Sequence, residues 1–154
     1  MTELRIRVVG TPAPQGSKRH VGNGVMVEMS KRVRPWRQDV AAAAEQVVRH
    51  EEWHPPRSVQ IEVTFWFRRP KHHYGTGRNA HQLRERAPEY HAQTPDLDKL
   101  VRATLDALKT AGAITDDCTV VRIAADKRWA SAEQATGAQI RVIEFPPIQQ
   151  GEHT

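Results

Sequence analysis

The strongest constraint on the fold of this chain is the strict alternation of apolar and polar residues over positions 59–67. Val59, Ile61, Val63, Phe65 and Phe67 occupy every second position. Successive side chains of a strand point to opposite faces, so this run predicts a β-strand with one buried face. Such a face has to be covered by another layer of the protein, because a single strand cannot bury it alone.

Weaker patterns predict the elements that would complete this sheet. Further strands are expected at residues 4–9, 119–125 and 139–145. Residues 20–29 contain a Gly-Asn-Gly turn between short apolar stretches, which predicts a hairpin. Apolar residues at helical spacing predict helices over residues 35–50 and 97–111, the second closed by Gly112. The expected class is α+β, with two main helices packed on one mixed or antiparallel sheet.

The size and composition of the chain narrow its class. Its 154 residues suit a single domain, here 1–154, with a flexible tail expected over 146–154. No apolar run approaches the ~18–20 residues of a membrane span, and the N-terminus lacks a signal-peptide hydrophobic region. The single cysteine, Cys118, cannot form an internal disulfide. We therefore expect a cytoplasmic protein that does not contact membranes.

Charge is distributed unevenly along the chain. The net charge is +5, and residues 1–50 alone carry nine basic and four acidic side chains. Residues 68–95 carry six basic and two acidic side chains, and residues 69–95 show no periodicity. We expect this long loop to be a mobile basic arm, because structureless connections of this length are uncommon unless functional or disordered. The basic balance points to a polyanion such as nucleic acid.

One segment, residues 96–117, reverses the sign of the charge. Its five aspartates outnumber three basic residues; the acidic residues are Asp96, Asp98, Asp106, Asp116 and Asp117. They could simply form helix ends and a turn, or they could form a divalent-metal site surrounded by a surface that binds phosphate. All-oxygen ligands with no histidine beside them fit Mg²⁺ or Mn²⁺ better than zinc.

The spacing of these aspartates restricts where their carboxylates can point. Asp96 and Asp98 would diverge on a helix but share a face in an extended segment, and Pro95 favours an extended start. We therefore expect an extended segment with Asp98 near the helix N-cap. Asp117 would return beside them only if the fold bends suitably, which spacing alone leaves open. If it returns, a cation would relieve the repulsion among the carboxylates.

The same segment resembles a known protein family. The run Pro95-Asp-Leu-Asp-Lys-Leu-Val-Arg-Ala103, then Asp106-Ala-Leu108, Ala111-Gly112, Asp116-Asp117 and finally Lys127 is similar to the RusA family of Holliday junction resolvases. The N-terminal loop with Pro12, Pro14, Gln15, Lys18 and Arg19, and the Pro35-Trp36-Arg37 segment, resemble phage-borne members. The resemblance covers most of the chain except residues 69–93.

This resemblance implies a function and a set of functional residues. It implies a homodimeric, Mg²⁺-dependent endonuclease, with Mn²⁺ as a substitute, that resolves four-way DNA junctions by paired incisions in a bacterial or phage-infected cell. It requires no small-molecule cofactor. Asp96, Asp98 and Asp117 fall on the metal-binding carboxylates of the family, with Asp116 adjacent. Arg102 replaces a catalytic lysine and Lys99 replaces an asparagine. The DNA-binding candidates are Lys18, Arg19, Lys99, Lys127, Arg69 and Lys71.

Other interpretations remain open at this level. The aspartates could be structural caps in a non-enzymatic DNA-binding module, or the chain could cut branched DNA and flaps in general. His72, His73, His81 and His91 with Cys118 could suggest zinc, but their spacing matches no zinc module. Asp106 is expected to be a structural partner of Arg102 or of a backbone amide. The four tryptophans are expected to serve as core or dimer anchors, and one of them could stack on an unpaired base. The strand of residues 59–67 is expected to offer apolar surface for a dimer.

Overall fold

The computed structural model describes residues 3–16 and 23–146, and this part of the chain is built around one four-stranded sheet. Its strands are β1 (Glu3–Val9), β2 (Val59–Arg68), β3 (Val120–Ala130) and β4 (Gly137–Glu144), in the order β1-β4-β2-β3. The pairs β1–β4 and β4–β2 are antiparallel, whereas β2–β3 is parallel. The sheet is therefore mixed, one of the two arrangements expected from the sequence.

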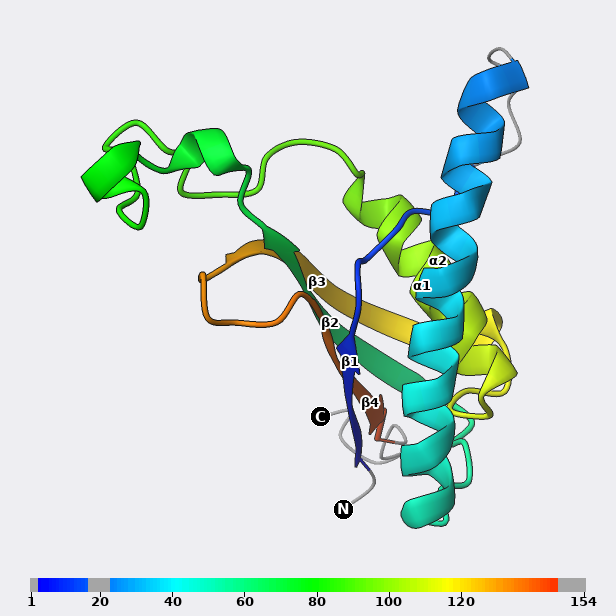
Figure 1. Cartoon of the computed structure of the whole chain (residues 1–154). Coiled ribbons are helices and arrows are strands. Elements are labelled where there is room, and N and C mark those ends of the chain that lie inside the picture. Colours follow the sequence, from blue (N-terminus) through cyan, green and yellow to red (C-terminus); the bar gives the residue numbers. More distant parts are fainter. Residues whose placement is uncertain (1–2, 17–22, 147–154) are drawn as a thin grey trace, which may run out of the picture.

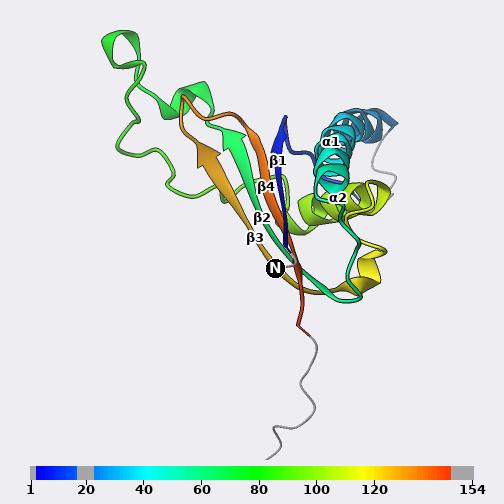
Figure 2. The same ribbon diagram turned by 90° about the horizontal axis from the view of Figure 1, so that it is seen from below.

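The two helices lie on the same face of the sheet. Helix α1 (Asn23–His50) and helix α2 (Leu97–Thr110) pack against each other there, as Figures 1 and 2 show. Helix α2 buries Leu100, Ala103, Ala107 and Leu108 beneath it, and its opposite side carries the charged residues. This amphipathic pattern is the reason that its sequence predicted a helix. The α+β class is confirmed.

The alternating run that predicted β2 forms the centre of the core. Its apolar residues are all buried between the sheet and the helices: Val59, Ile61, Val63, Phe65 and Phe67. The indole of Trp36 on α1 lies against Phe65, with ring centroids 6.5 Å apart. This face is covered by the core of its own chain and therefore supplies no apolar surface for a dimer. The expectation that these residues contribute to a dimer interface was wrong.

Helix α1 begins earlier than its sequence suggested. The hairpin predicted for residues 20–29 is absent from 23–29, which are helical, while 20–22 lie outside the described residues. Gly24 falls in the first turn, where the amide groups have no intrahelical acceptor and regularity is least demanding. Pro35, interpreted as a helix start, lies inside the helix, where its ring removes only one hydrogen bond. The end of the helix at His50 agrees with the prediction.

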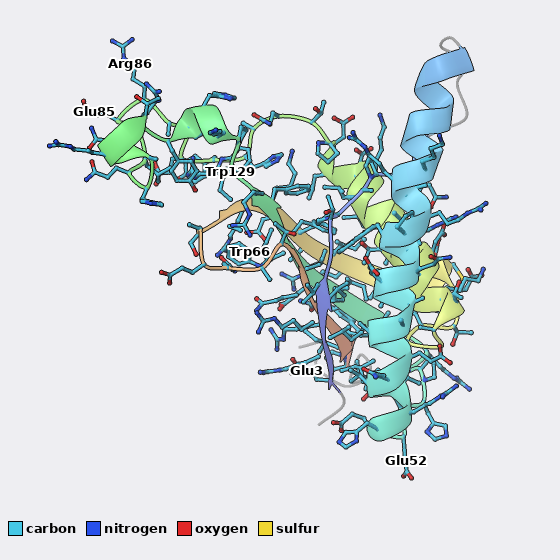
Figure 3. The ribbon with its side chains drawn as sticks, viewed as in Figure 1. Glu3, Glu52, Trp66, Glu85, Arg86 and Trp129 are labelled. Carbon is cyan, nitrogen blue, oxygen red and sulfur yellow. The ribbon has the colours of Figure 1, made fainter. Side chains whose placement is uncertain are left out.

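The connection from β2 to α2 projects from one end of the sheet. It contains two short 3₁₀ turns, Lys71–His73 and Gly77–Asn79, and an isolated bridge between Tyr74 and Leu83. Figure 3 shows Glu85 and Arg86 at its outer part and Trp129 at its base. The segment is thus a long connection with local turns; its role as a mobile basic arm stays a prediction.

Helix α2 ends as its sequence predicted. Ala111 is the C-cap residue and Gly112 follows with φ of +79°, a left-handed conformation that favours glycine. Beyond Pro146, the predicted tail lies outside the described residues. None of the helices in 23–146 contains a stretch long and apolar enough to cross a bilayer.

Candidate active site

The first group of candidate residues lies at the N-terminal end of α2. Asp96 is the N-cap residue and is extended, with φ of −69° and ψ of 137°. Its carboxylate pairs with Lys99, with Oδ2 and Nζ 3.1 Å apart. Asp98 lies inside the first helical turn and is exposed. The helix therefore starts one residue too early for Asp96 and Asp98 to share the extended face that we expected.

Two contacts hold this end of α2 in place. Lys127, near the end of β3, donates from Nζ to the carbonyl oxygens of Gln93 at 2.6 Å and Pro95 at 2.9 Å. The backbone amide of Gln15 donates to the carbonyl of Lys99 at 3.1 Å, which ties the N-terminal loop to the first turn. Lys127 was expected to bind phosphate or form a salt bridge, and in the structure it braces the segment that precedes Asp96.

The second group lies at the other end of α2. Asp116 caps the 3₁₀ turn Asp117–Thr119: its Oδ1 accepts a hydrogen bond from the amide of Asp117 at 2.8 Å. Lys109 Nζ lies 3.1 Å from the same oxygen. This contact lowers the pKa of Asp116. Burial raises the pKa of Asp117, and the negative charges of Asp106 and Asp116 raise it further.

A single chain keeps the two groups apart. Helix α2 has 14 residues, so its ends are about 20 Å apart. Lys127 contacts Pro95, whereas Asp117 lies ten positions earlier along the extended chain of β3, about 30 Å away. Within the described residues, no three acidic, histidine or cysteine side chains are close enough to hold a metal ion. The structure therefore does not bring Asp117 beside Asp96 and Asp98 within one chain, because β3 runs back along α2.

Arg102 lies one helical turn after Asp98. It is exposed, and no hydrogen bond or ion pair joins it to another described residue. The predicted pair with Asp106 does not form; instead Asp106 Oδ2 lies 3.8 Å from Nη1 of Arg37 on α1. This pair between helices was not predicted, because sequence spacing within one helix carries no signal for it. The guanidinium of Arg102 remains available to a ligand.

The remaining DNA-binding candidates are scattered around this region. Arg69 donates to the carbonyl of Pro88 at 2.6 Å and lies over the indole of Trp129, 5.4 Å from the ring centroid. Lys71 is exposed at the start of the arm. Lys18 and Arg19 lie outside the described residues. The structure thus leaves Lys71 free and gives Arg69 a structural role as well.

The buried histidines have a structural explanation. His73 and His91 are both about 5% exposed and pack around Trp129, with ring centroids 5.1 Å and 4.2 Å from it. Burial lowers the pKa of each imidazole, so both favour the neutral form. Cys118 lies at the start of β3, at the opposite end of the sheet. This arrangement separates the groups that a zinc site would have required.

A groove beside Asp96 was not predicted from the sequence. It has a volume of about 920 Å³ and lies between residues 10–14, one side of α1 and the start of α2. Its floor is apolar and buried, formed by Pro12, Ala13, Trp36 and Phe67. The sequence indicated this groove only through the prolines at 12, 14, 35 and 95. These prolines are spread along the chain and come together only in the fold.

Comparison with known proteins assigns this arrangement to a family. The model of the endodeoxyribonuclease RusA family matches residues 9–142, most of the chain. No curated protein gives a significant match. The match runs from the last residue of β1 into β4 and includes both ends of α2, and it overturns the interpretation of the chain as a non-enzymatic DNA-binding module. Nucleases of this family are generally dependent on divalent metals. The chain belongs to the RusA family of endonucleases, which act on branched DNA and resolve Holliday junctions.

Proposed function

We propose that this chain is a homodimeric, Mg²⁺-dependent resolvase whose metal ligands are Asp96, Asp98 and Asp117, with Asp116 beside them. The observation that carries the proposal is the placement of these carboxylates at opposite ends of one helix. Two of these carboxylates lie at each end, and a Mg²⁺ ion needs ligand oxygens that meet within about 2.1 Å of it. We infer that one copy contributes Asp96 and Asp98, and that a second contributes Asp117.

The donor set supports a hard cation. Carboxylates predominate at both ends, and although Cys118 follows Asp117, the described residues bring no histidine together with them in a group that could hold zinc. Burial raises the pKa of Asp117 despite the nearby Lys109, so a bound cation would stabilise its charged form. When bound, Mg²⁺ would supply Lewis acidity and an activated water for phosphodiester hydrolysis. Mn²⁺ should substitute, since it accepts the same oxygen ligands.

A second copy has an available surface at β3. This strand is at the edge of the sheet, so its outer backbone groups have no ladder partner among the described strands. Val121 and Ile123 are exposed on it, at 55% and 44%. Asp117 lies just before these residues, so a contact across β3 would bring Asp117 near the partner. A two-fold dimer also presents two equivalent sites to the two strands that must be cut.

The basic residues around Asp98 are proposed to contact DNA. Arg102 lies where it can stabilise charge on the phosphate, and its fixed positive charge suits this role better than proton transfer. Lys99, Lys71 and Arg69 would contact the backbone, and Lys18 and Arg19 belong to the same proposal although they lie outside the described residues. Lys127 would act mainly by holding the segment before Asp96.

Complementation between two inactive variants tests the shared site. Asp98→Asn and Asp117→Asn should each abolish cleavage. In their heterodimer, one shared site carries both substitutions and the other carries neither, so the mixture should nick a four-way junction. If each site were built from one chain, every site would carry one substitution and the mixture would stay inactive. Differently tagged subunits, recovered together, would establish that exchange took place.

The substrate is tested with the wild-type protein. Cleavage of a synthetic four-way junction with Mg²⁺, and none with EDTA, is expected, while linear duplex should resist. Equal cleavage of flaps and three-way junctions would instead favour a general nuclease for branched DNA. Sedimentation as a strict monomer at micromolar concentration would contradict the dimer. Binding should weaken steeply with salt, because neutralised phosphates release counterions.

A further inference from the structure

We propose that the groove beside Asp96 binds one unstacked nucleotide of the DNA strand that is cut. The proposal rests on the proposed function, since it assumes that the scissile phosphate lies at Asp96 and Asp98. The groove extends from the exposed carboxylate of Asp96 toward α1 and the N-terminal loop. It is a separate recognition site, distinct from the carboxylates themselves.

The floor of the groove suits a flat, apolar ring. Its volume of about 920 Å³ is within the range of pockets that hold small molecules. Pro12, Ala13, Trp36 and Phe67 form a buried apolar surface, to which Pro35 and Pro95 add at the sides. A base that leaves its stack exposes two apolar faces, and apolar or aromatic side chains replace the lost stacking. A paired base inside a duplex could not reach this floor.

The rim of the groove suits the sugar and phosphate of a nucleotide. Three cationic side chains line it, those of Lys31, Arg32 and Lys99. Among the described residues, only two carboxylates do so, those of Asp39 and Asp96. The rim therefore carries a net positive charge. On α1 the lining residues at 31, 32, 35, 36 and 39 form one stripe of the helix, so its cations face the same side as the floor.

The position of the groove favours DNA over a protein as its occupant. Asp96 lies on its rim and is a proposed metal ligand, so a phosphate bound there brings the neighbouring nucleotide of the same strand to the mouth. The loop of residues 10–14 is fastened nearby by the Gln15–Lys99 backbone hydrogen bond, and the start of α2 is fastened by Lys127. Both walls are thus held, and the groove exists before DNA binds. At the centre of a four-way junction, bases unstack at a lower free-energy cost than bases inside a continuous duplex.

A groove-filling variant combined with an abasic substrate tests this proposal. Thr11 is exposed on the groove wall, and Thr11→Trp should fill the space above the floor. Once the cut position has been mapped, junctions are made with an abasic residue on either side of it, and binding is measured in EDTA. Removal of the correct base should weaken wild-type binding about tenfold, the value of one stacked base.

The expected pattern is a non-additive one. Thr11→Trp should also weaken binding about tenfold on the intact junction, with no further loss on the abasic junction, because both changes remove the same contact. Binding to linear duplex should be unchanged. Gln46 is exposed on α1, ten residues after Trp36. Gln46→Trp is therefore the control for adding an aromatic ring elsewhere on the same helix. Lys31→Ala with Arg32→Ala should weaken junction binding more than Arg34→Ala, because Arg34 is exposed but does not line the groove.

The outcomes separate this proposal from the function on which it rests. If wild type cleaves junctions but neither abasic position changes affinity, the groove does not bind a base and the nuclease assignment stands. If Thr11→Trp instead alters the monomer–dimer equilibrium, the groove belongs to the subunit interface and the proposal is overturned. If wild type cuts no branched DNA, the proposed function itself fails, whatever the binding results.

Discussion

The two ends of helix α2 carry aspartates in contrasting surroundings. At the N-terminal end, Asp96 pairs with Lys99, and Asp98 is exposed one turn from the unpaired Arg102. At the C-terminal end, burial raises the pKa of Asp117 and the charges of Asp106 and Asp116 raise it further. Lys109 pairs with Asp116 there. The first group therefore has an exposed carboxylate near an unpaired cation, whereas the second contains a carboxylate whose charge is disfavoured. The first is suited to receive phosphate, and the second is suited to receive a cation.

This contrast explains why neither end is sufficient as a site. A metal ion bound only at the N-terminal end would have two carboxylates and would compete with Lys99. One bound only at the C-terminal end would compete with Lys109 and would lie far from Arg102 and from the groove beside Asp96. In the proposed dimer, joining the two ends would place the cation, the phosphate and the basic residues together. The predictions that follow test each end of the helix in turn.

The largest effect is expected from the N-terminal end. Asp98→Asn should reduce single-turnover junction cleavage by about 10³-fold or more, because it removes a metal ligand and an electrostatic contribution to the transition state. Junction affinity should be retained or should increase, since a negative charge facing phosphate is lost. Asp126→Asn on the outer face of β3, where Asp126 pairs with Arg128, is the matched control. Loss of binding together with cleavage would indicate a structural role for Asp98.

A smaller effect is expected from the cation one turn away. Arg102→Ala should slow cleavage by about 10²-fold with little change in junction affinity, because one stabilising charge is lost. Arg102→Lys should retain most of the activity if the residue acts as a fixed charge. Arg49→Ala, an exposed arginine paired with Glu45 on α1, controls for a change in net charge. Near-wild-type rates for Arg102→Ala would remove Arg102 from the catalytic residues.

The sequence predicted the scaffold of this site better than its geometry. Alternation in β2 and amphipathic spacing in α2 are local patterns, and the elements and the buried face followed from them. The start of α1 could not be predicted, because Gly24 and Pro35 are both typical of helix boundaries. Whether a long helix continues through these two residues depends on how it packs on the rest of the protein. The neighbouring sequence carries no information about that packing.

The residues of the site were easier to identify than their positions. The Asp-rich segment differs in charge from the rest of the chain, and that signal is local. Whether Asp117 reaches Asp98 depends on the direction of β3 relative to α2, and thus on the parallel pairing with β2. Likewise, the bracing role of Lys127 and the pair between Arg37 and Asp106 join residues far apart in sequence. Spacing carries no information about such contacts.

An intermediate effect is expected where β3 braces the N-terminal end. Lys127→Met should slow cleavage about tenfold, because the carbonyls of Gln93 and Pro95 lose their shared donor and Asp96 loses its fixed position. The free energy of unfolding in urea should fall by about 1–2 kcal/mol, a typical value for charge-assisted hydrogen bonds that are partly exposed. Lys127→Arg should recover part of the cleavage rate and part of the free energy of unfolding. If cleavage falls while salt-dependent affinity falls in parallel, Lys127 would instead be a phosphate contact.

The smallest effects are expected at the C-terminal end, where two adjacent substitutions should change stability in opposite directions. Asp117 has a raised pKa, chiefly from burial, so its charged form is disfavoured in the folded state. Asp117→Asn should therefore stabilise the metal-free protein at neutral pH. The gain should shrink as the pH falls through the raised pKa toward the unfolded value, because wild-type Asp117 then becomes protonated.

Asp116 has a lowered pKa, chiefly from its hydrogen bond with Lys109, so its charge stabilises the fold at neutral pH. Asp116→Asn keeps an oxygen that can accept from the Asp117 amide but loses the ion pair, so it should destabilise slightly. That loss should disappear as the pH falls below the lowered pKa, and it should shrink in high salt because the pair is exposed. The same change relieves repulsion on Asp117, so the double variant should depart from additivity. Urea unfolding curves across the acidic range measure all three variants; two shifts of the same sign at neutral pH would contradict the opposite effects of the folded structure on the charges of Asp116 and Asp117.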